Sequence, residues 1–536
     1  MSEHNASAGH PLPSDRPDDR PSDAPAVPMA AGVVPLTGGT LWLAALVLAA
    51  ANFMAVLDMT VANVSVPSIA GNLGATTSQG TWVITSYAVA EAITVPLTGW
   101  MASRFGAVRV FATSMGLFGL ASLLCGMANS LGMLVFARIL QGLAGGPLMP
   151  LSQSLLLRIF PPRMAPAAIG LWSMTTLIAP VLGPIVGGWI CDNYTWHWIF
   201  LINIPVALVC AFASWHLIKR YELPLLKNPI DKVGLGLLIL WVGSLQLMLD
   251  EGKNLDWFES PQIIALAIVA AVGFAAFMIW ELHEEHPIVD LRVFRHRGFS
   301  MAVLTISLAF AAFFAVNVLT PLWLQSFMGY TATKAGLVTA WTGVFALFVA
   351  PAAAGLSAKV DPRRLIFMGV FWMGIITLWR SVASTDMGYW DIALPLMFMG
   401  FGLPFFFIPT TGLALASVEP REMDNAAGLM NFLRTLSGAA AVSIVNTAWE
   451  NGTTRKHAEL VGLSDSTGEV LHGLQQSGMS HDASLSALDQ IITGQSVMLA
   501  TNQIMMVIAA GFVIAACVIW LAPKPTRVVE PGAGGH

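Results

Sequence analysis

The chain has 536 residues, of which 56% are hydrophobic and only 11% are charged, and its formal net charge is −5. Because soluble domains carry about 25% charged residues, this composition excludes a soluble globular protein and indicates an all-α polytopic membrane protein. Four cysteines lie scattered among apolar segments without metal or disulfide spacing. We therefore expect no metal site and no cofactor, and nothing in the charge predicts a nucleic-acid partner.

The first 39 residues are polar and rich in Pro, Asp and Ser. They lack the basic region and cleavage site of a signal peptide. We expect a disordered cytoplasmic tail over 1–39, followed by a first membrane span that is retained.

Fourteen apolar runs follow, each close to the ~20 residues that a helix needs to cross a bilayer. The runs are continuously apolar and do not alternate, which excludes transmembrane strands. They lie near 41–67, 79–102, 108–128, 131–157, 166–190, 198–217, 233–250, 262–280, 299–326, 335–357, 364–384, 392–415, 425–448 and 499–521.

The 26 Lys and Arg residues test this count and set the orientation. With the N-terminus inside, nineteen fall on cytoplasmic loops and tails, four fall outside and three lie within spans. Positive residues concentrate on the cytoplasmic loops of membrane proteins. The bias therefore predicts that both termini are cytoplasmic.

Asp58, in the first run, is the most informative residue of the chain. A carboxylate at membrane depth costs several kcal/mol, roughly, unless it is paired, protonated or hydrated. Arg138, in the fourth run, is a candidate partner. A buried acid whose charge changes beside a fixed cation is what proton-coupled transport needs, with Arg138 lowering the pKa of Asp58 when the two approach. The alternative is a purely structural ion pair between helices.

Two other ionisable residues lie within spans. Glu91, in the second run, is a second candidate for proton coupling or an attractor of cations, and alternatively an acid at a helix interface. Arg434, in the thirteenth run, could bind an anionic substrate or form a structural pair. We expect the substrate cavity to be lined by a polar and aromatic set: Asn63, Gln153, Trp172, Asn317, Asn431 and Arg434.

The fifth run contains Gly183, Pro184, Gly187 and Gly188. Glycines spaced by four give one smooth helix face that a second helix can approach closely, and prolines bend the helix. No Gly-rich phosphate loop of the ATP-binding type occurs in the chain. Energy for transport must then come from an ion gradient or from the gradient of the substrate.

A weak internal repeat suggests two six-helix units. Gly99, Arg104 and Arg109 follow the second run with spacings of five and ten, and Ala354, Lys359 and Arg364 repeat those spacings after the tenth. Repeated halves around a central site are usual in secondary transporters. The expected division is an N-terminal bundle (40–217), an inserted helix pair (218–298), a C-terminal bundle (299–521) with a periplasmic loop (449–498), and a cytoplasmic tail (522–536). The loop is predicted to be a cap or a docking surface, or else a flexible linker.

Several segments together resemble the signatures of the major facilitator superfamily, and within it the fourteen-span drug:proton antiporters of the EmrB type. The resemblance covers about 41–521 and rests on these stretches: 58–64 with Pro67, 79–83, 99–109, 138–147, 150–157, 179–188, 192–194 with 198–200, 255–258 and 287–291. It assigns Arg138 to a proton-coupling motif, the glycines and proline of the fifth run to an antiporter motif that limits leak, and four residues to an inner gating loop: Gly99, Arg104, Gly106 and Arg109. One departure is Ser103, where the gating loop commonly has an acid.

The resemblance implies a major facilitator fold of two six-helix bundles plus two extra transmembrane helices, placed in a bacterial inner membrane. It implies export of small amphipathic drugs in exchange for protons, the proton being the coupling ion. Exporters of this type act with a periplasmic membrane-fusion adaptor and, through it, an outer-membrane channel. Two alternatives stay open: a dedicated exporter of one metabolite, such as a fatty acid or siderophore, and a membrane-embedded enzyme, for which the sequence shows no catalytic constellation.

Overall fold

The computed structural model describes residues 36, 38–75, 77–161, 164–222, 224–225, 229–463, 472, 475–476 and 479–524. The predicted tails, 1–39 and 522–536, lie almost entirely outside these residues. The described part of the chain is helical throughout, with turns and short 3₁₀ segments between helices and no strand. The all-α prediction is therefore confirmed.

The helices of the first half are α1 (Gly38–Asn72), α2 (Thr77–Gly80), α3 (Trp82–Thr94), α4 (Thr98–Phe105), α5 (Ala107–Gly126), α6 (Leu131–Gly145), α7 (Leu148–Ile159), α8 (Ala165–Asn193), α9 (Trp198–Leu201) and α10 (Asn203–Ile218). The inserted pair is α11 (Lys232–Glu251) and α12 (Pro261–His283). The second half contains α13 (Arg297–Ser326), α14 (Ala332–Ser357), α15 (Pro362–Arg380), α16 (Tyr389–Ala416), α17 (Met423–Leu463) and α19 (His481–Val518).

Each of the fourteen predicted spans corresponds to one helix or to two helices that meet at a short break. Eleven of them, within the described residues, are long and apolar enough to cross a membrane as one continuous segment, and α8, which is bent by 44°, makes a twelfth. The other two are α3 with α4, interrupted at 95–97, and α15, whose 19 residues include three arginines. The break in the second span follows from Pro96, since proline interrupts the helical hydrogen-bond ladder.

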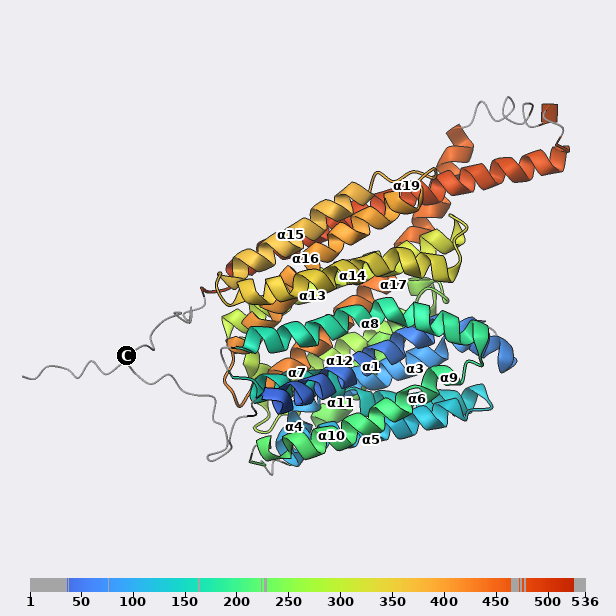
Figure 1. Ribbon diagram of the computed structural model, residues 1–536. Helices are drawn as coiled ribbons and strands as arrows, with labels where there is room; N and C mark the ends of the chain where they lie inside the picture. The colour runs from blue at the N-terminus through green and yellow to red at the C-terminus, as the bar shows by residue number, and fades with distance from the viewer. Residues whose placement is uncertain are drawn as a thin grey trace, which may run out of the picture.

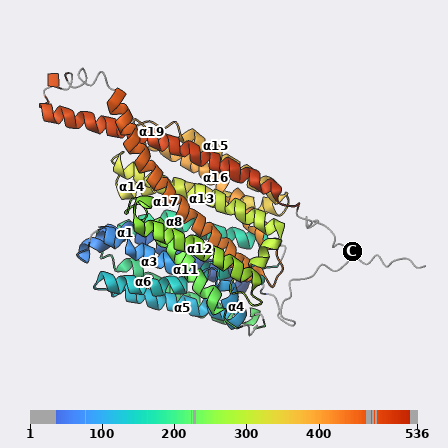
Figure 2. The ribbon, with the colours of Figure 1, turned by 180° about the vertical axis from the view of Figure 1, so that it is seen from behind.

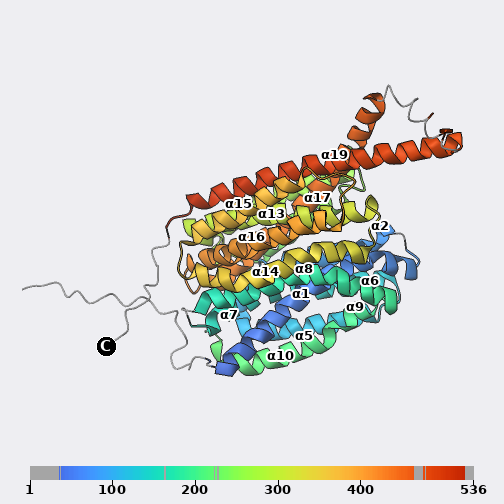
Figure 3. The same cartoon turned by 45° about the horizontal axis from the view of Figure 1, so that its top comes forward.

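The helices form two bundles that lie side by side (Figures 1 and 3). One bundle contains α1 to α10 and the other α13 to α19, and the most extensive contact between them is made by α8 and α14. The extra pair, α11 and α12, packs together beside α3 and α17 on the face shown in Figure 2. This arrangement is the two-bundle fold with an inserted pair that the sequence predicts.

The longest helices are α17, with 41 residues, and α19, with 38. At about 1.5 Å per residue both are roughly 60 Å long, about twice the hydrocarbon thickness of a bilayer. Their excess length projects from one end of the molecule (Figure 1). The predicted loop over 449–498 is therefore, in its described part, mostly two helical extensions.

We call these extensions the projecting hairpin, residues 450–463 and 481–497. At its base, the indole of Trp449 donates to the hydroxyl of Thr501 at 2.9 Å, and further out His457 contacts Asp489 at 3.2 Å. The end of the molecule that carries the projecting hairpin is the hairpin end. The opposite end, where α1 begins and α19 finishes, is the tail end.

Helices α1 and α8 approach closely at two glycines. A Cβ atom on Gly183 would lie 2.6 Å from the Cβ of Thr60, and one on Gly187 would lie 3.0 Å from the carbonyl oxygen of Val61. A Cβ on Gly188 would meet no described neighbouring atom within 4 Å. The predicted smooth face therefore packs on α1 through Gly183 and Gly187, and Gly188 lies off that contact.

We expect Gly183→Ala to destabilise the protein by about 1–3 kcal/mol, because the added methyl overpacks the α1–α8 contact. Gly188→Ala is the matched control, since it makes the same change in helix propensity one turn away without a clash. Thermal unfolding of both purified variants in detergent measures the difference. Equal midpoints for the two variants would show that close packing at Gly183 is unimportant.

Candidate functional site

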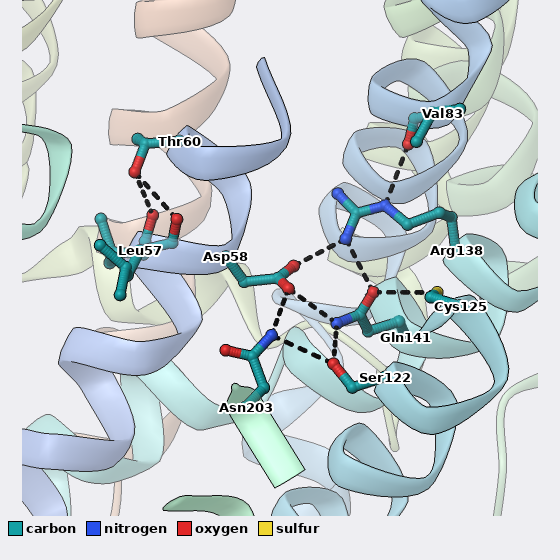
Figure 4. Close-up of polar contacts among 10 residues, drawn as sticks. Leu57, Asp58, Thr60, Val83, Ser122, Cys125, Arg138, Gln141 and Asn203 are labelled. Carbon is teal, nitrogen blue, oxygen red and sulfur yellow. Dashed lines mark hydrogen bonds and ion pairs between the residues drawn. The ribbon is translucent and has the colours of Figure 1, made fainter. Parts of the chain in front are cut away.

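Asp58 of α1 and Arg138 of α6 form a buried ion pair. Their side chains are 1% and 0% exposed, and Arg138 Nη1 lies 2.6 Å from Asp58 Oδ2 (Figure 4). The structure therefore forms the partnership that the sequence suggests for these two residues. In a low-dielectric interior such a pair is stable only when its remaining polar atoms are also satisfied.

Two side-chain amides complete the coordination of the Asp58 carboxylate. Gln141 Nε2 donates to Oδ1 at 3.0 Å, and Asn203 Nδ2 donates to the same oxygen at 2.6 Å. The hydroxyl of Ser122 accepts from both amides, at 2.8 and 3.1 Å. The carboxylate thus receives three donors, from α6 and α10, while α5 orients the amides (Figure 4).

Sequence reasoning missed Gln141, Asn203 and Ser122 as members of this site. Gln141 carried a usable signal, because it follows Arg138 by three positions and so shares its helix face. Asn203 and Ser122 carried none, since each is a single polar residue in an apolar run and only packing shows which polar group it meets.

Arg138 is held on its other side by α3 and by aromatic rings. Its Nε donates to the carbonyl of Val83 at 3.0 Å, and its Nη1 also donates to Gln141 Oε1 at 2.7 Å. The guanidinium lies 4.2 Å from the ring centre of Tyr87 and 5.5 Å from that of Phe200. These contacts hold the Arg138 guanidinium against α3 and the aromatic rings.

Glu91 lies on α3, one turn after Tyr87, and is half-buried. It interacts electrostatically with Asp58, Arg138 and Arg434, but it belongs to no ion pair among the described residues. Glu91 therefore interacts with Arg138 and Arg434 at longer range and forms no ion pair with either.

The glycine motif of α8 packs against the turn of α1 that follows Asp58. Gly183 faces Thr60 and Gly187 faces Val61. The helix is bent between Ala165–Pro180 and Ile185–Asn193, as the prolines predict. The side chain of Pro184 lies outside the described residues. The two glycines thus place α8 in direct contact with the segment of α1 that carries Asp58.

A second polar cluster joins the two bundles near the centre of the molecule. Asn431 Nδ2 of α17 donates to Gln153 Oε1 of α7 at 2.9 Å. The ring of Trp172 from α8 stacks on that of Phe407 from α16, with centroids 5.9 Å apart. Arg434 lies over the same two rings. Four of the six residues predicted to line the cavity therefore lie together.

The structure does not bring the other two predicted cavity residues into this cluster. Asn63 is exposed. Asn317 is half-buried, and its amide donates to the carbonyl of Phe313 in its own helix at 2.9 Å. Both lie in long, mostly apolar helices, and a polar type alone does not determine which face of the helix it occupies.

The tail end is closed by contacts between α17 and the first bundle. A Cβ on Gly99 would lie 2.7 Å from the Cα of Asn425. Arg158, at the end of α7, forms a partly buried ion pair with Asp424, at the start of α17. Ser103 donates to the carbonyl of Trp100 in its own helix. The charged contact between the bundles at this end is thus made by Arg158 and Asp424, and not by the residue at position 103.

The gating loop itself turns at Gly106, whose φ of +98° is a conformation that favours glycine. A Cβ there would lie 2.5 Å from the carboxylate carbon of Glu222. That carboxylate accepts from the backbone amides of Val108 and Arg109, both at 3.1 Å, and so caps α5. Burial raises the pKa of Glu222, although the two amides oppose the rise. Arg109 is exposed and Arg104 is half-buried.

One group of metal-compatible side chains occurs in the described part of the chain: His296, Glu419 and Glu422, whose ligand atoms lie within 4.8 Å of one another. Glu422 already contacts Arg295 and His296, both at 2.9 Å, and Glu419 contacts Arg295 at 3.3 Å. An ion-pair network at the tail end accounts for this group.

Comparison with known proteins agrees with this geometry. The family model of the Major Facilitator Superfamily matches residues 48–442. The chain is 44% identical to the multidrug export protein EmrB of Haemophilus influenzae over 92% of this chain and 97% of that one. It is 42% identical to the fatty acid resistance protein FarB of Neisseria gonorrhoeae over 94% and 99% of the two chains.

The fold also resembles that of a solved transporter. The proton:xylose symporter XylE superposes with a TM-score of 0.56 at 16% identity, over 90% of this chain and 96% of that one. With two helical bundles, a buried charge network and a match over most of its length, the chain belongs to the major facilitator superfamily, and it is a membrane transporter and not an enzyme.

Proposed function

We propose that this transporter exports hydrophobic or amphipathic compounds across a bacterial inner membrane in exchange for protons. The observation that carries the proposal is the buried pair of Asp58 and Arg138, with amide donors converging on the carboxylate. The identity to multidrug export proteins supports the direction of transport and the class of substrate.

The proton step follows from the coordination of Asp58. Three donors stabilise its charged form in the present state. When α1 moves away from α6 and α10, the carboxylate loses these donors in a low-dielectric environment and takes up a proton. When the helices return, Arg138 and the two amides displace that proton. Uptake and release of a proton by Asp58 thereby couple helix movement to proton transfer.

In the proposed orientation the tail end faces the cytoplasm, because the tails and the loops at that end carry most of the Lys and Arg residues. The ion pair between Arg158 and Asp424 and the close contact at Gly99 then close the cytoplasmic side. Substrate entry from the cytoplasm requires these contacts to open. Alternating access is the rocking of the two bundles about the central cluster.

A second candidate is a dedicated exporter of one metabolite, of which a fatty acid is the better supported example. It is favoured by the 42% identity to a protein named for fatty acid resistance. The two candidates share the same coupling chemistry and differ only in how many substrates the central site admits.

The projecting hairpin is proposed to contact a periplasmic membrane-fusion adaptor, which would continue to an outer-membrane channel. The transporter crosses one bilayer only, so delivery beyond a second membrane needs a partner. The described surface of the projecting hairpin carries charges of both signs, including Arg455, Lys456, Glu459 and Asp489. A polar contact is therefore expected.

Asp58→Asn should abolish proton-coupled export while leaving the protein folded and inserted, because the amide keeps the shape of the side chain but cannot ionise. Substrate-induced proton release from purified protein and drug export from vesicles measure the loss, which we expect to exceed 100-fold, roughly, for a group that carries the proton itself. Asp192→Asn, at an exposed acid at the end of α8, is the matched control. Proton release at the wild-type level from Asp58→Asn protein would show that Asp58 does not carry the coupled proton.

Replacing residues 456–491 by a short flexible linker should remove the outer part of the projecting hairpin and keep its base at Trp449 and Thr501. Adaptor co-purification and drug resistance of whole cells should be lost, while transport in reconstituted vesicles survives. Failure of vesicle transport to the same extent would make the projecting hairpin a gate or a folding element. Full adaptor binding by the shortened protein would place the docking surface elsewhere, for example on α11 and α12.

A further inference from the structure

Arg434 of α17 is a buried cation without an acidic partner. Arg434 is 2% exposed, and its side chain takes part in no ion pair among the described residues. Its Nε and Nη1 atoms have no hydrogen-bond partner within the described part of the chain. Among the described residues, the one hydrogen-bond contact of its side chain is that of Nη2 with the sulfur of Met149, at 2.6 Å.

Aromatic rings surround the Arg434 guanidinium from both bundles. Its carbon lies 4.8 Å from the ring centre of Phe310, 5.4 Å from that of Phe407 and 5.7 Å from that of Trp172. Cation–π contacts contribute about 0.5–2 kcal/mol each, whereas an uncompensated buried charge costs several kcal/mol, roughly. The rings hold the cation in place but leave most of its hydrogen-bonding capacity unused.

Further unused polar atoms lie next to Arg434. Asn431 precedes it by three positions and shares its helix face, and Asn431 is bonded to Gln153 of α7. The Gln153 Nε2 donor and the Asn431 Oδ1 acceptor are buried and have no partner among the described residues. Met149, which touches Arg434, and Gln153 lie one turn apart on α7. Three donor nitrogen atoms without a partner among the described residues, two on Arg434 and one on Gln153, thus border the same inter-bundle contact.

The two buried arginines of the central region differ in this respect. Arg138 is paired with Asp58, and only its Nη2 atom has no hydrogen-bond partner among the described residues. Arg434 interacts with Glu91 only at longer range, since the two form no ion pair. Arg138 is therefore paired with Asp58, whereas Arg434 is available to bind an anion.

We propose that Arg434 and Gln153 bind the acidic head group of the exported substrate, so that the transporter accepts amphipathic anions, carboxylates above all. The planar guanidinium of arginine matches a carboxylate with two parallel hydrogen bonds. The apolar body of the substrate then packs on Phe310, Trp172 and Phe407. This inference rests on the proposed export function and specifies its substrate class.

In this structure the two bundles are in contact at Arg434 and Gln153, and this contact covers the proposed binding site. The bond between Asn431 and Gln153 and the contact between Met149 and Arg434 both cross from one bundle to the other. Separation of the bundles breaks them together and exposes the guanidinium and the Gln153 amide to an entering substrate. A bound carboxylate replaces the contacts that are lost on opening.

The test compares two probes with the same twelve-carbon chain and opposite charge, dodecanoate and dodecyltrimethylammonium. Binding of each to the purified full-length protein in nanodiscs is measured for the wild type, for Arg434→Gln and for Arg434→Lys. We expect Arg434→Gln to weaken dodecanoate binding at least tenfold and to leave binding of the cation unchanged or stronger. Arg434→Lys should restore part of the affinity, because it keeps the charge but not the planar fork.

Arg380→Gln is the matched control. Arg380 is also a buried arginine without an ion pair among the described residues, but its guanidinium donates to Thr320 within one bundle. Arg380→Gln should therefore leave the preference for dodecanoate over dodecyltrimethylammonium unchanged. Wild-type protein that binds no dodecanoate, or equal loss of both probes in Arg434→Gln, would overturn the inference and make Arg434 a structural cation.

Export assays separate this inference from the proposed function. In vesicles with an imposed proton gradient, the wild type should export dodecanoate and Asp58→Asn should not, while Asp58→Asn should still bind it. Binding that depends on Arg434 without any proton-driven export would refute the proposed function and leave the anion site standing. Export of the cation alone would refute the anion site and leave proton-driven export standing.

Discussion

The structure depends on one constraint, which is that a charge inside hydrocarbon must be neutralised by contacts that the protein itself supplies. The ion pair of Asp58 and Arg138 meets this constraint only because Gln141 and Asn203 complete the coordination of the carboxylate. The network joins α1, α5, α6 and α10, with the carbonyl of Val83 adding α3. No lipid can replace any of these partners. Five helices of the first bundle therefore meet in the network around this single acid.

The second bundle holds its buried arginines Arg434 and Arg380 by other contacts than an ion pair. Arg434 is held by aromatic rings and by the sulfur of Met149, and Arg380 is held by one hydroxyl, both without a carboxylate in contact among the described residues. The two halves therefore differ. The first bundle contains a matched ion pair, and the second contributes, among the described residues, a cation without an acidic partner at the boundary between the bundles.

Close helix packing provides the mechanical link between these regions. Lipid chains are as apolar as the side chains that face them, so helices in a bilayer associate through close contacts of small residues and through polar bonds. Gly183 and Gly187 bring α8 against the turn of α1 that follows Asp58, and α8 also makes the main contact with α14 of the other bundle. Helix α8 therefore contacts both the segment of α1 that carries Asp58 and the second bundle.

The sequence by itself determined the membrane class, the fourteen apolar segments, the two halves with an inserted pair, and the partnership of Asp58 with Arg138. These follow from local chemistry: a bilayer needs about 20 apolar residues per helix, and a buried charge needs an opposite one.

Only the tertiary structure decided which of the polar residues meet. It placed Asn203 and Ser122 at Asp58, left Asn63 and Asn317 outside the central cluster, and matched Arg158 with Asp424 at the closed end. It also showed that the supposed loop over 449–498 continues α17 and α19, because polar helices beyond the bilayer lack the apolar pattern that marks a span and are stabilised by contact with each other. Pairings across helices depend on rotation and depth of each helix, and a single polar residue in an apolar run encodes neither.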